Sequence, residues 1–495
     1  MTNLHIRKTS SGEELNISLK NFSAQDFLWL SIALLPLLLI AFLLPITMQD
    51  YWWYLRLGKD IVSGGGVPNI DTYSFTHLGE PIINLTWLSA VLLWFAYSVG
   101  GITGTFLLRG LVIGLSYGTL WVLLRQCGGG RRMTSLLVIV AGLSGSNNWS
   151  FRPQMFSYPL FIVTLFVLSN WQNGRNKNLW MLPILAFLWA NLHGSFLMMF
   201  ILAFPAIFFG KGDRKVLAQW TFAAFLATLI NPYGLILWES ILHSLISPLS
   251  FNLSTEWAPP VNLGWQMNIY FGWLLILMFL PSISPIKLSA LEWLWLLGLG
   301  WMSLSGLRFV IWELFIFSLC TTRLLAGLNT SWIETTSAPK KPLLNFLMGI
   351  LILLVSIAAL PGLRQSMGLK EPPAVSLDTP VTAVTWLARH DKLPGPMWND
   401  VSYGSYLIFA LPSRPVWIDT RFEMIYPASQ YLKFIKIAQA EPGWEDLLQK
   451  EGINLLFLSV DGESILMANV ENSSEWCQQY RDEIAVIFSR CNPIQ

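Results

Sequence analysis

The sequence predicts a mainly α-helical polytopic membrane protein with a small soluble α/β domain at its C-terminal end. Of its 495 residues, 54% are hydrophobic and only 12% are charged, about half the charged share of an average soluble domain. The apolar residues form long runs as far as residue 360, after which charge returns and short apolar runs alternate with helical patterns. Most of the chain is therefore expected to face lipid.

Eleven apolar runs are long enough, alone or inside a bundle, to be membrane-spanning helices. They lie at 27–48, 104–124, 133–148, 156–170, 178–192, 196–210, 216–232, 268–284, 289–306, 309–326 and 343–360. The first run is too long for a signal-peptide core, so we expect a retained helix after a cytoplasmic tail of residues 1–26. A further apolar piece, Ile82–Val99, is expected to lie on the outer membrane surface within an outer loop of residues 49–103.

Lys and Arg orient the predicted helices. They gather in loops that all fall on one side of the membrane if the N-terminus is inside, among them 125–132, 175–177 and 211–215. Positive charge in short loops marks the cytoplasmic side. An odd number of spans then places residues 361–495 outside the inner (plasma) membrane. No basic patch indicates nucleic-acid binding.

Residues 361–495 are expected to form the exported α/β domain. Apolar β-type runs lie at 415–419, 454–460 and 485–489, and helical patterns lie at 379–390 and 429–439. Cys477 and Cys491 form a disulfide if this region is exported, or else remain free buried thiols. Two turns, one at Gly404 and one carrying Asp419, Arg421 and Glu423, either bind a polar ligand or cap helices.

Polar side chains stand at the outer ends of several predicted spans. Charge is costly in hydrocarbon and is tolerated mainly at water-filled sites. Residues that are distant in sequence but meet at one membrane depth therefore indicate an outward-facing cavity. The set is Asp50, Arg152, His193, Asn231, Glu256 and Arg308.

Asp50 follows the first span directly and precedes the aromatic run 51–54. A carboxylate half-withdrawn from water can act as a general base that takes a proton from an acceptor hydroxyl or amine. It can equally mark a helix end beside an interfacial aromatic belt. Position alone leaves these two interpretations equal.

Arg152, His193 and Arg308 are candidate phosphate contacts. Guanidinium groups bind phosphate oxygens in bidentate fashion, and a histidine can donate to phosphate, move a proton or bind metal. The alternatives are arginines that reach lipid headgroups and a histidine satisfied by a neighbouring helix. Two arginines and a histidine on one face favour a binding site.

Asp71 and Glu256 are acids that can join Asp50 in holding a divalent cation such as Mg²⁺ or Mn²⁺. They can instead bind an acceptor. The simpler interpretation is that both are solvated loop acids. No histidine or cysteine spacing indicates zinc. The run SGGGVPNID before and through Asp71 lacks the context of a nucleotide-binding loop and is expected to be a flexible turn.

The motifs resemble the GT-C superfamily of membrane glycosyltransferases. The resemblance rests on Asp50, the pattern GxxPxxDxYSFTxxGxP at Gly65–Pro81, a surface helix from Trp87, and the motifs RPQMFS, NLHGSF, INPYG, WNDVSYGSYLI and PVWIDTRFEMIY. Within the superfamily the chain is similar to bacterial protein-mannosyltransferase and lipid A aminoarabinose transferase relatives. These motifs are distributed over most of the chain.

The resemblance implies an enzyme that takes a sugar from a polyprenyl-phosphate-linked donor and transfers it to a glycan, lipid or protein acceptor at the outer face. It implies that Asp50 is the base and that Arg152, His193 and Arg308 contact the donor phosphate. Many members carry two adjacent acids after the first span, whereas Gln49 precedes Asp50 here. The alternatives are a transporter, a non-catalytic lipid-carrier-binding protein, or a polymerase or ligase of lipid-linked glycans.

Overall fold

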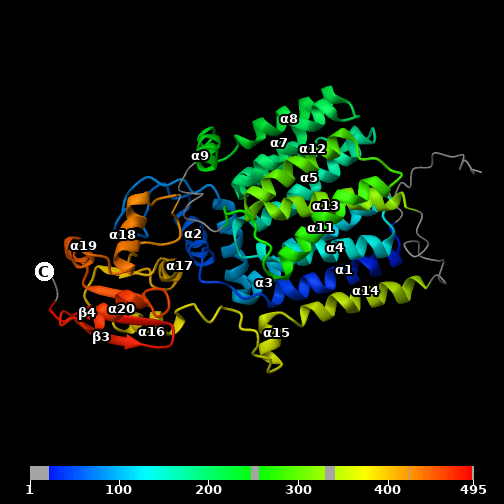
Figure 1. The fold of residues 1–495 in the computed structure, drawn as a ribbon. Helices are drawn as coiled ribbons and strands as arrows, with labels where there is room; N and C mark the ends of the chain where they lie inside the picture. The colour runs from blue at the N-terminus through cyan, green and yellow to red at the C-terminus, as the bar shows by residue number, and fades with distance from the viewer. Residues whose placement is uncertain (1–21, 247–255, 329–340, 423, 493–495) are drawn as a thin grey trace, which may run out of the picture.

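A computed structural model describes residues 22–246, 256–328, 341–422 and 424–492. A long bundle of helices lies beside a smaller α/β domain that holds the C-terminal part of the chain (Figure 1). The helices from α1 to α14 form the bundle, except for α2 and α9 (Ile236–Ile246), which lie toward the α/β domain. The strands lie in the α/β domain, beyond one end of the bundle. Glu423 lies outside the described residues.

Every predicted span coincides with a helix of the bundle. These helices are α1 (Ala24–Leu43), α3 (Trp87–Gln126), α4 (Arg131–Gly145), α5 (Ser157–Gln172), α6 (Met181–Leu192), α7 (Leu197–Phe209), α8 (Arg214–Thr228), α11 (Gly264–Ile283), α12 (Ala290–Ser305), α13 (Val310–Ala326) and α14 (Pro342–Ile357). Within the described residues, four helical segments are long and apolar enough to cross a membrane. That all eleven cross it stays a prediction.

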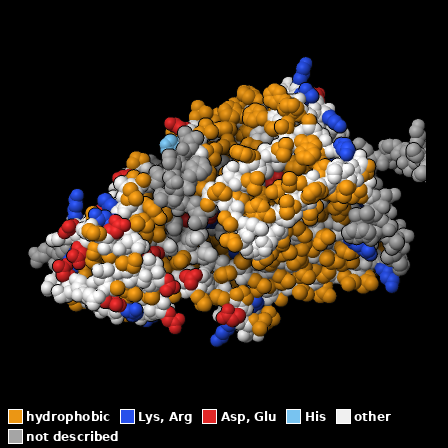
Figure 2. Space-filling model, in the orientation of Figure 1, with side chains coloured by type: hydrophobic (Ala, Val, Ile, Leu, Met, Phe, Trp, Pro, Cys, Tyr) orange, Lys and Arg blue, Asp and Glu red, His pale blue; other side chains and the backbone are white. Residues whose placement is uncertain are grey.

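The outer surface of the bundle is apolar, as lipid contact requires. Hydrophobic side chains cover its visible face, and Lys and Arg side chains gather at the end away from the α/β domain (Figure 2). At the start of α1, Asp26 forms ion pairs with Arg131 at 2.8 Å and Arg125 at 3.4 Å. The loop at 125–132, which its charge predicts to be cytoplasmic, therefore meets the start of α1.

The predicted outer loop contains two helical segments. Tyr51–Gly64 forms helix α2, which the sequence did not predict because its charged and aromatic residues lower its hydropathy. A Cβ on Gly58 would lie 2.1 Å from the carbonyl oxygen of Ala90, so this glycine lets α2 pack directly on the start of α3. The chain breaks at Gly101 (φ 56°), which separates Trp87–Gly100 from the next predicted span. That the segment Trp87–Gly100 lies on the membrane surface stays a prediction.

The C-terminal domain contains a four-stranded sheet among the residues that the structure describes. The strands are β1 (Met397–Asn399), β2 (Leu455–Ser459), β3 (Trp476–Arg481) and β4 (Ala485–Arg490), in the order β1-β2-β4-β3. Strand β1 is parallel to β2, and the other pairs are antiparallel. The surrounding helices are α15 (Pro361–Ser366), α16 (Val381–Arg389), α17 (Val401–Ala410), α18 (Ala428–Ala438), α19 (Trp444–Lys450) and α20 (Ser464–Glu471).

The strand predicted at 415–419 is wrong. Val416 forms only an isolated bridge with Ser74 of the first outer loop, and the Trp417 N–H donates to Asn399 Oδ1 at 2.8 Å. The backbone bonds of this segment thus go to distant loops and a side chain, which local propensity cannot indicate. Gly404, expected in a turn, lies inside α17. The structure pairs Cys477 with Cys491 in a disulfide, which decides between the two alternatives for these residues.

Glu463 gives the C-terminal domain a testable pH dependence. Its side chain is buried, and burial followed by the charge of Asp400 and a hydrogen bond with it raises the pKa of Glu463 well above its usual range. The folded domain keeps this proton, whereas the unfolded chain loses it above a pH of about 4.3. The stabilisation is therefore full below that pH and is lost as pH rises, by up to about 1.4 kcal/mol per pH unit.

We expect the wild-type protein to lose more thermal stability between about pH 5 and pH 8 than the Glu463→Gln variant, because glutamine keeps a neutral polar group without a titrating proton. Thermal unfolding followed by tryptophan fluorescence measures the difference. An equal pH dependence of the two proteins would contradict the assignment.

Candidate functional site

A polar cavity of about 470 Å³ lies between the bundle and the C-terminal domain. It is lined by five of the six residues predicted to stand at the outer ends of spans: Asp50, Arg152, His193, Glu256 and Arg308. Asp50 lies directly before α2, His193 ends α6, and Arg308 lies in the short turn Leu307–Phe309 before α13. The ends of separate helices thus bring distant residues together.

Arg152 is the electrostatic centre of the cavity. Its Nε lies 3.0 Å from Asp50 Oδ2, and its Nη1 forms an ion pair with Glu256. Its Nη2 donates to Gln49 Oε1 at 2.9 Å. Arg152 is fixed locally by the extended backbone before Pro153, which opens the turn Pro153–Phe156. One guanidinium therefore joins three oxygen-bearing side chains.

His193 is neutral and has a defined tautomer. Burial, and then the charge of Arg308, lowers the pKa of His193. The backbone N–H of Ser195 donates to His193 Nδ1 at 3.0 Å, so Nδ1 is an acceptor and the proton is on Nε2. The Ser195 hydroxyl also lies 2.8 Å from Nδ1. The histidine can consequently donate one hydrogen bond from Nε2.

Arg308 is held against the loop that carries Glu256. Its backbone N–H donates to the Glu256 carbonyl at 3.0 Å, and the guanidinium carbon lies 4.4 Å from the ring centroid of Trp257. The N–H of Leu307 donates to the Ala258 carbonyl at 2.9 Å. A planar guanidinium stacked on an aromatic face is preorganised for bidentate contact with an anion.

Two of the singled-out polar residues lie outside the cavity. Asn231 closes a turn, since its Oδ1 accepts the Tyr233 N–H at 2.7 Å. Asp71 is buried, and its carboxylate is bonded to Arg421 at 2.5 Å and to the hydroxyl of Ser74 at 2.5 Å. The predicted cation set of Asp50, Asp71 and Glu256 is thus not assembled.

The residues of the cavity do not fit a divalent cation. In the part of the chain that the structure describes, no group of three or more His, Cys, Asp or Glu side chains is placed to hold a metal ion. Arg152 pairs with both Asp50 and Glu256, so a cation shared by these acids would have to displace its guanidinium. We therefore derive no chemical step through a metal.

The C-terminal domain also lines the cavity, with Thr420, which the sequence does not single out, and with Arg421, whose turn is predicted either to bind a polar ligand or to cap helices. Thr420 Oγ1 donates to Asp50 Oδ1 at 2.6 Å. Arg421, Phe422, Met424 and Tyr431 also line the cavity. The signal in the sequence is the segment IDTRFEMIY, in which three charged residues stand among apolar and aromatic ones and which predicts a turn.

Two mainly apolar cavities adjoin the polar one. One of about 500 Å³ shares Gln49, Asp50 and Arg152 with it, and one of about 230 Å³ shares His193 and Arg308. Each offers apolar space directly beside the polar cavity.

No protein-family model matches the sequence, and no curated protein matches it. Solved structures of the archaeal oligosaccharyltransferase AglB from Archaeoglobus fulgidus share its fold. The apo form has a TM-score of 0.58 at 12% identity and covers 90% of this chain and 70% of AglB.

Two further AglB structures agree with the apo form. The complex with an inhibitory peptide and a dolichol-phosphate has a TM-score of 0.54 at 11% identity, with 91% of this chain and 73% of AglB covered. The form tethered to an acceptor peptide has a TM-score of 0.56 at 12% identity, with 94% and 74% covered. The chain therefore shares the fold of this archaeal oligosaccharyltransferase over nearly its whole length.

Proposed function

We propose that this protein is a membrane glycosyltransferase that transfers a sugar from a polyprenyl-phosphate-linked donor to a glycan, lipid or protein acceptor. The observation that carries the proposal is the shared cavity in which Asp50 lies beside Arg152, His193 and Arg308. The proposed sugar transfer uses a base, two cationic side chains and a neutral hydrogen-bond donor at one place, together with apolar space for the lipid carrier. The dolichol-phosphate and peptides bound by AglB support a lipid-phosphate carrier, and the acceptor remains one of the three classes.

The proposed reaction is a nucleophilic displacement at the anomeric carbon. Asp50 removes a proton from the acceptor hydroxyl or amine while the acceptor atom forms its bond to the sugar. The bond from the anomeric carbon to the phosphate oxygen breaks, and the carrier phosphate leaves with the electron pair. Arg152 and Arg308 stabilise the charge that develops on it, and His193 donates from Nε2.

The proposed site of action is the outer face of the inner (plasma) membrane, with residues 361–495 outside. The Cys477–Cys491 disulfide supports this placement, because disulfides persist mainly in oxidising compartments. The gathering of Lys and Arg at the other end of the bundle supports it independently.

The test uses the full chain in lipid nanodiscs with radiolabelled polyprenyl-phosphate sugars and membrane extract as the acceptor source. We expect label to move from the carrier to an acceptor, and undecaprenyl phosphate to bind. Binding without transfer from any donor would replace this proposal with a non-catalytic carrier-binding protein. The absence of both would favour a transporter. Elongation of a lipid-linked glycan would identify a polymerase, and transfer of a whole glycan a ligase.

Substitution of Arg152 or Arg308 by Ala is expected to weaken binding of undecaprenyl phosphate on the order of 10-fold each, the value of one hydrogen bond to a charged group. Arg56→Ala is the matched control, since Arg56 pairs with Asp60 on α2 and does not line the cavity. Microscale thermophoresis measures the affinities. Unchanged affinity in both cavity variants would remove the phosphate assignment.

A further inference from the structure

Asp50 receives a hydrogen bond from the other side of the domain boundary. Thr420, which lies 370 positions further along the chain, donates from Oγ1 to Asp50 Oδ1 at 2.6 Å. The other carboxylate oxygen, Oδ2, faces Arg152 Nε at 3.0 Å. Oδ1 also accepts a longer hydrogen bond from Trp53 Nε1 of α2 at 3.5 Å. The short hydrogen bond to Oδ1 therefore comes from the C-terminal domain, and the ion pair to Oδ2 comes from the bundle.

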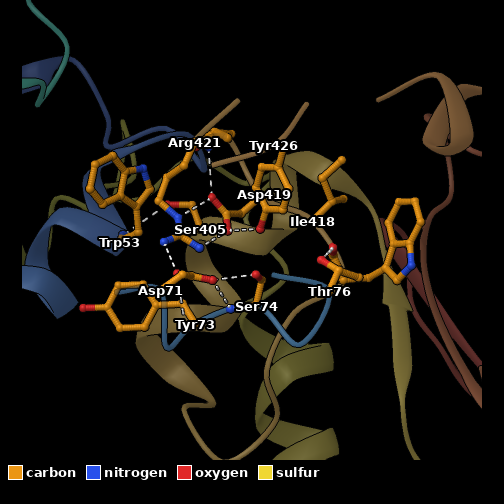
Figure 3. Close-up of polar contacts among 12 residues, drawn as sticks. Trp53, Asp71, Tyr73, Ser74, Thr76, Ser405, Ile418, Asp419, Arg421 and Tyr426 are labelled. Atoms are coloured by element: carbon orange, nitrogen blue, oxygen red, sulfur yellow. Dashed lines mark hydrogen bonds and ion pairs between the residues drawn. The ribbon is translucent and has the colours of Figure 1, made fainter. Parts of the chain in front are cut away.

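The loop that carries Thr420 is anchored on both of its sides by buried groups. Arg421, which follows it, forms ion pairs with Asp419 at 2.7 Å and with Asp71 of the first outer loop at 2.5 Å (Figure 3). Ile418 is held through its carbonyl, which accepts from Asn399 Nδ2 at 2.8 Å. The position of Thr420 is thus set by a buried network rather than by its own side chain.

Helix α17 brings this loop close to α2. A Cβ on Gly404 would lie 2.4 Å from the Ile418 carbonyl oxygen, so only glycine permits this approach. One residue on, Ser405 Oγ accepts the backbone N–H of Trp53 at 3.2 Å. An N–H of the first turn of α2 has no partner within the helix, and here the C-terminal domain satisfies it. The start of α2, directly after Asp50, is thereby fixed to the same domain.

We propose that Thr420 is a positioning residue for Asp50, so that the C-terminal domain completes the catalytic site. This inference rests on the proposed function. A carboxylate beside a guanidinium tends to form a bidentate pair, with both oxygens turned to the cation. The hydroxyl of Thr420 holds Oδ1 away from that arrangement and keeps the carboxylate plane directed so that it can receive the acceptor's proton.

The test compares Thr420→Val, which removes the hydroxyl at nearly constant shape, with Thr420→Ser, which keeps it. The matched control is Thr76→Val: Thr76 donates across the same boundary at 2.9 Å (Figure 3), but to the Trp417 carbonyl instead of Asp50. Each variant is prepared as the full chain in nanodiscs. Turnover of the labelled donors, affinity for undecaprenyl phosphate and thermal stability are measured.

We expect Thr420→Val to lower turnover about 10-fold or more with unchanged affinity for undecaprenyl phosphate, since small errors in the position of a catalytic group have effects of this size. Thr420→Ser should restore turnover, and Thr76→Val should retain it. In the Asp50→Asn background, Thr420→Val should have no further effect, because residues that act as a unit are not additive. Equal turnover of Thr420→Val and the wild type would overturn the inference.

The failure of this inference is distinguishable from failure of the proposed function. If the wild type transfers no sugar, the proposed function fails and the positioning role fails with it. A double-mutant cycle of thermal stability on Asp50→Asn and Thr420→Val then separates a contact without catalysis from no contact at all. If the wild type transfers sugar and Thr420→Val matches it, only the positioning role is lost.

Discussion

The Asp50→Asn variant is expected to lose sugar transfer by at least about 100-fold, the usual contribution of a general base, while its affinity for undecaprenyl phosphate changes little. Asparagine has the same shape as aspartate and can still accept the Thr420 hydrogen bond at its amide oxygen. It cannot receive the acceptor's proton. Single-turnover transfer and carrier binding, measured on the same nanodisc preparation, separate the chemical step from donor binding.

Asp60→Asn is the matched control for this experiment. Asp60 is a carboxylate on the same helix, α2, where it pairs with Arg56 and accepts from the Tyr73 hydroxyl at 2.8 Å. It does not line the polar cavity. Transfer by Asp60→Asn should stay near the wild-type rate. Full activity of Asp50→Asn would exclude Asp50 as the base, and equal losses in both variants would indicate a general effect of charge on α2.

The sequence predicted the bundle well because lipid imposes long apolar runs, and each run became a helix. Helix α2 was not predicted because its charged and aromatic residues lower its hydropathy; packing buries its aromatic residues Tyr51, Trp52 and Trp53 in the folded protein. The strand predicted at 415–419 does not form, although its residues favour β structure. The backbone of this segment bonds instead to a distant loop at Ser74 and to the side chain of Asn399.

The candidate site was predictable where it depended on the ends of spans. Asp50, Arg152 and Arg308 were assigned to one membrane depth, and they do line one cavity. The contacts of Thr420 with Asp50 and of Arg421 with Asp71 were not predictable in this way, because these partners lie 370 and 350 positions earlier in the chain. For Asp71 the sequence offers a solvated loop acid or a cation ligand, because no local pattern indicates the arginine that it meets 350 positions later.

The buried ion-pair network around Arg421 joins the first outer loop to the C-terminal domain. Arg421, Asp71 and Asp419 are each at most 2% exposed. Burial by itself raises the pKa of Asp71, but the Arg421 charge and the hydrogen bonds from Ser74 and Arg421 outweigh it, so the pKa lies below its usual value. The acid therefore stays ionised and depends on Arg421 for compensation.

Arg421→Met is expected to destabilise the protein by about 3–5 kcal/mol, because it leaves two carboxylates buried without their cation. Arg421→Lys should recover only part of this loss, because lysine restores the positive charge but cannot make the paired hydrogen bonds of a guanidinium group. The matched control is Arg481→Met, which removes an exposed pair with Glu471 and should cost about 1 kcal/mol or less. Thermal unfolding of the three variants and the wild type measures the order of their stabilities.

The same substitution also tests how the two domains depend on each other. With Arg421 gone, the loop that presents Thr420 loses its anchor to Asp71, so sugar transfer should fall even at temperatures where the variant remains folded. Limited proteolysis should then cut the segment between the domains faster than in the wild type, because local opening exposes it. If Arg421→Met unfolds at the wild-type temperature, the network contributes little to the boundary, and the buried acids must be neutralised by protonation instead.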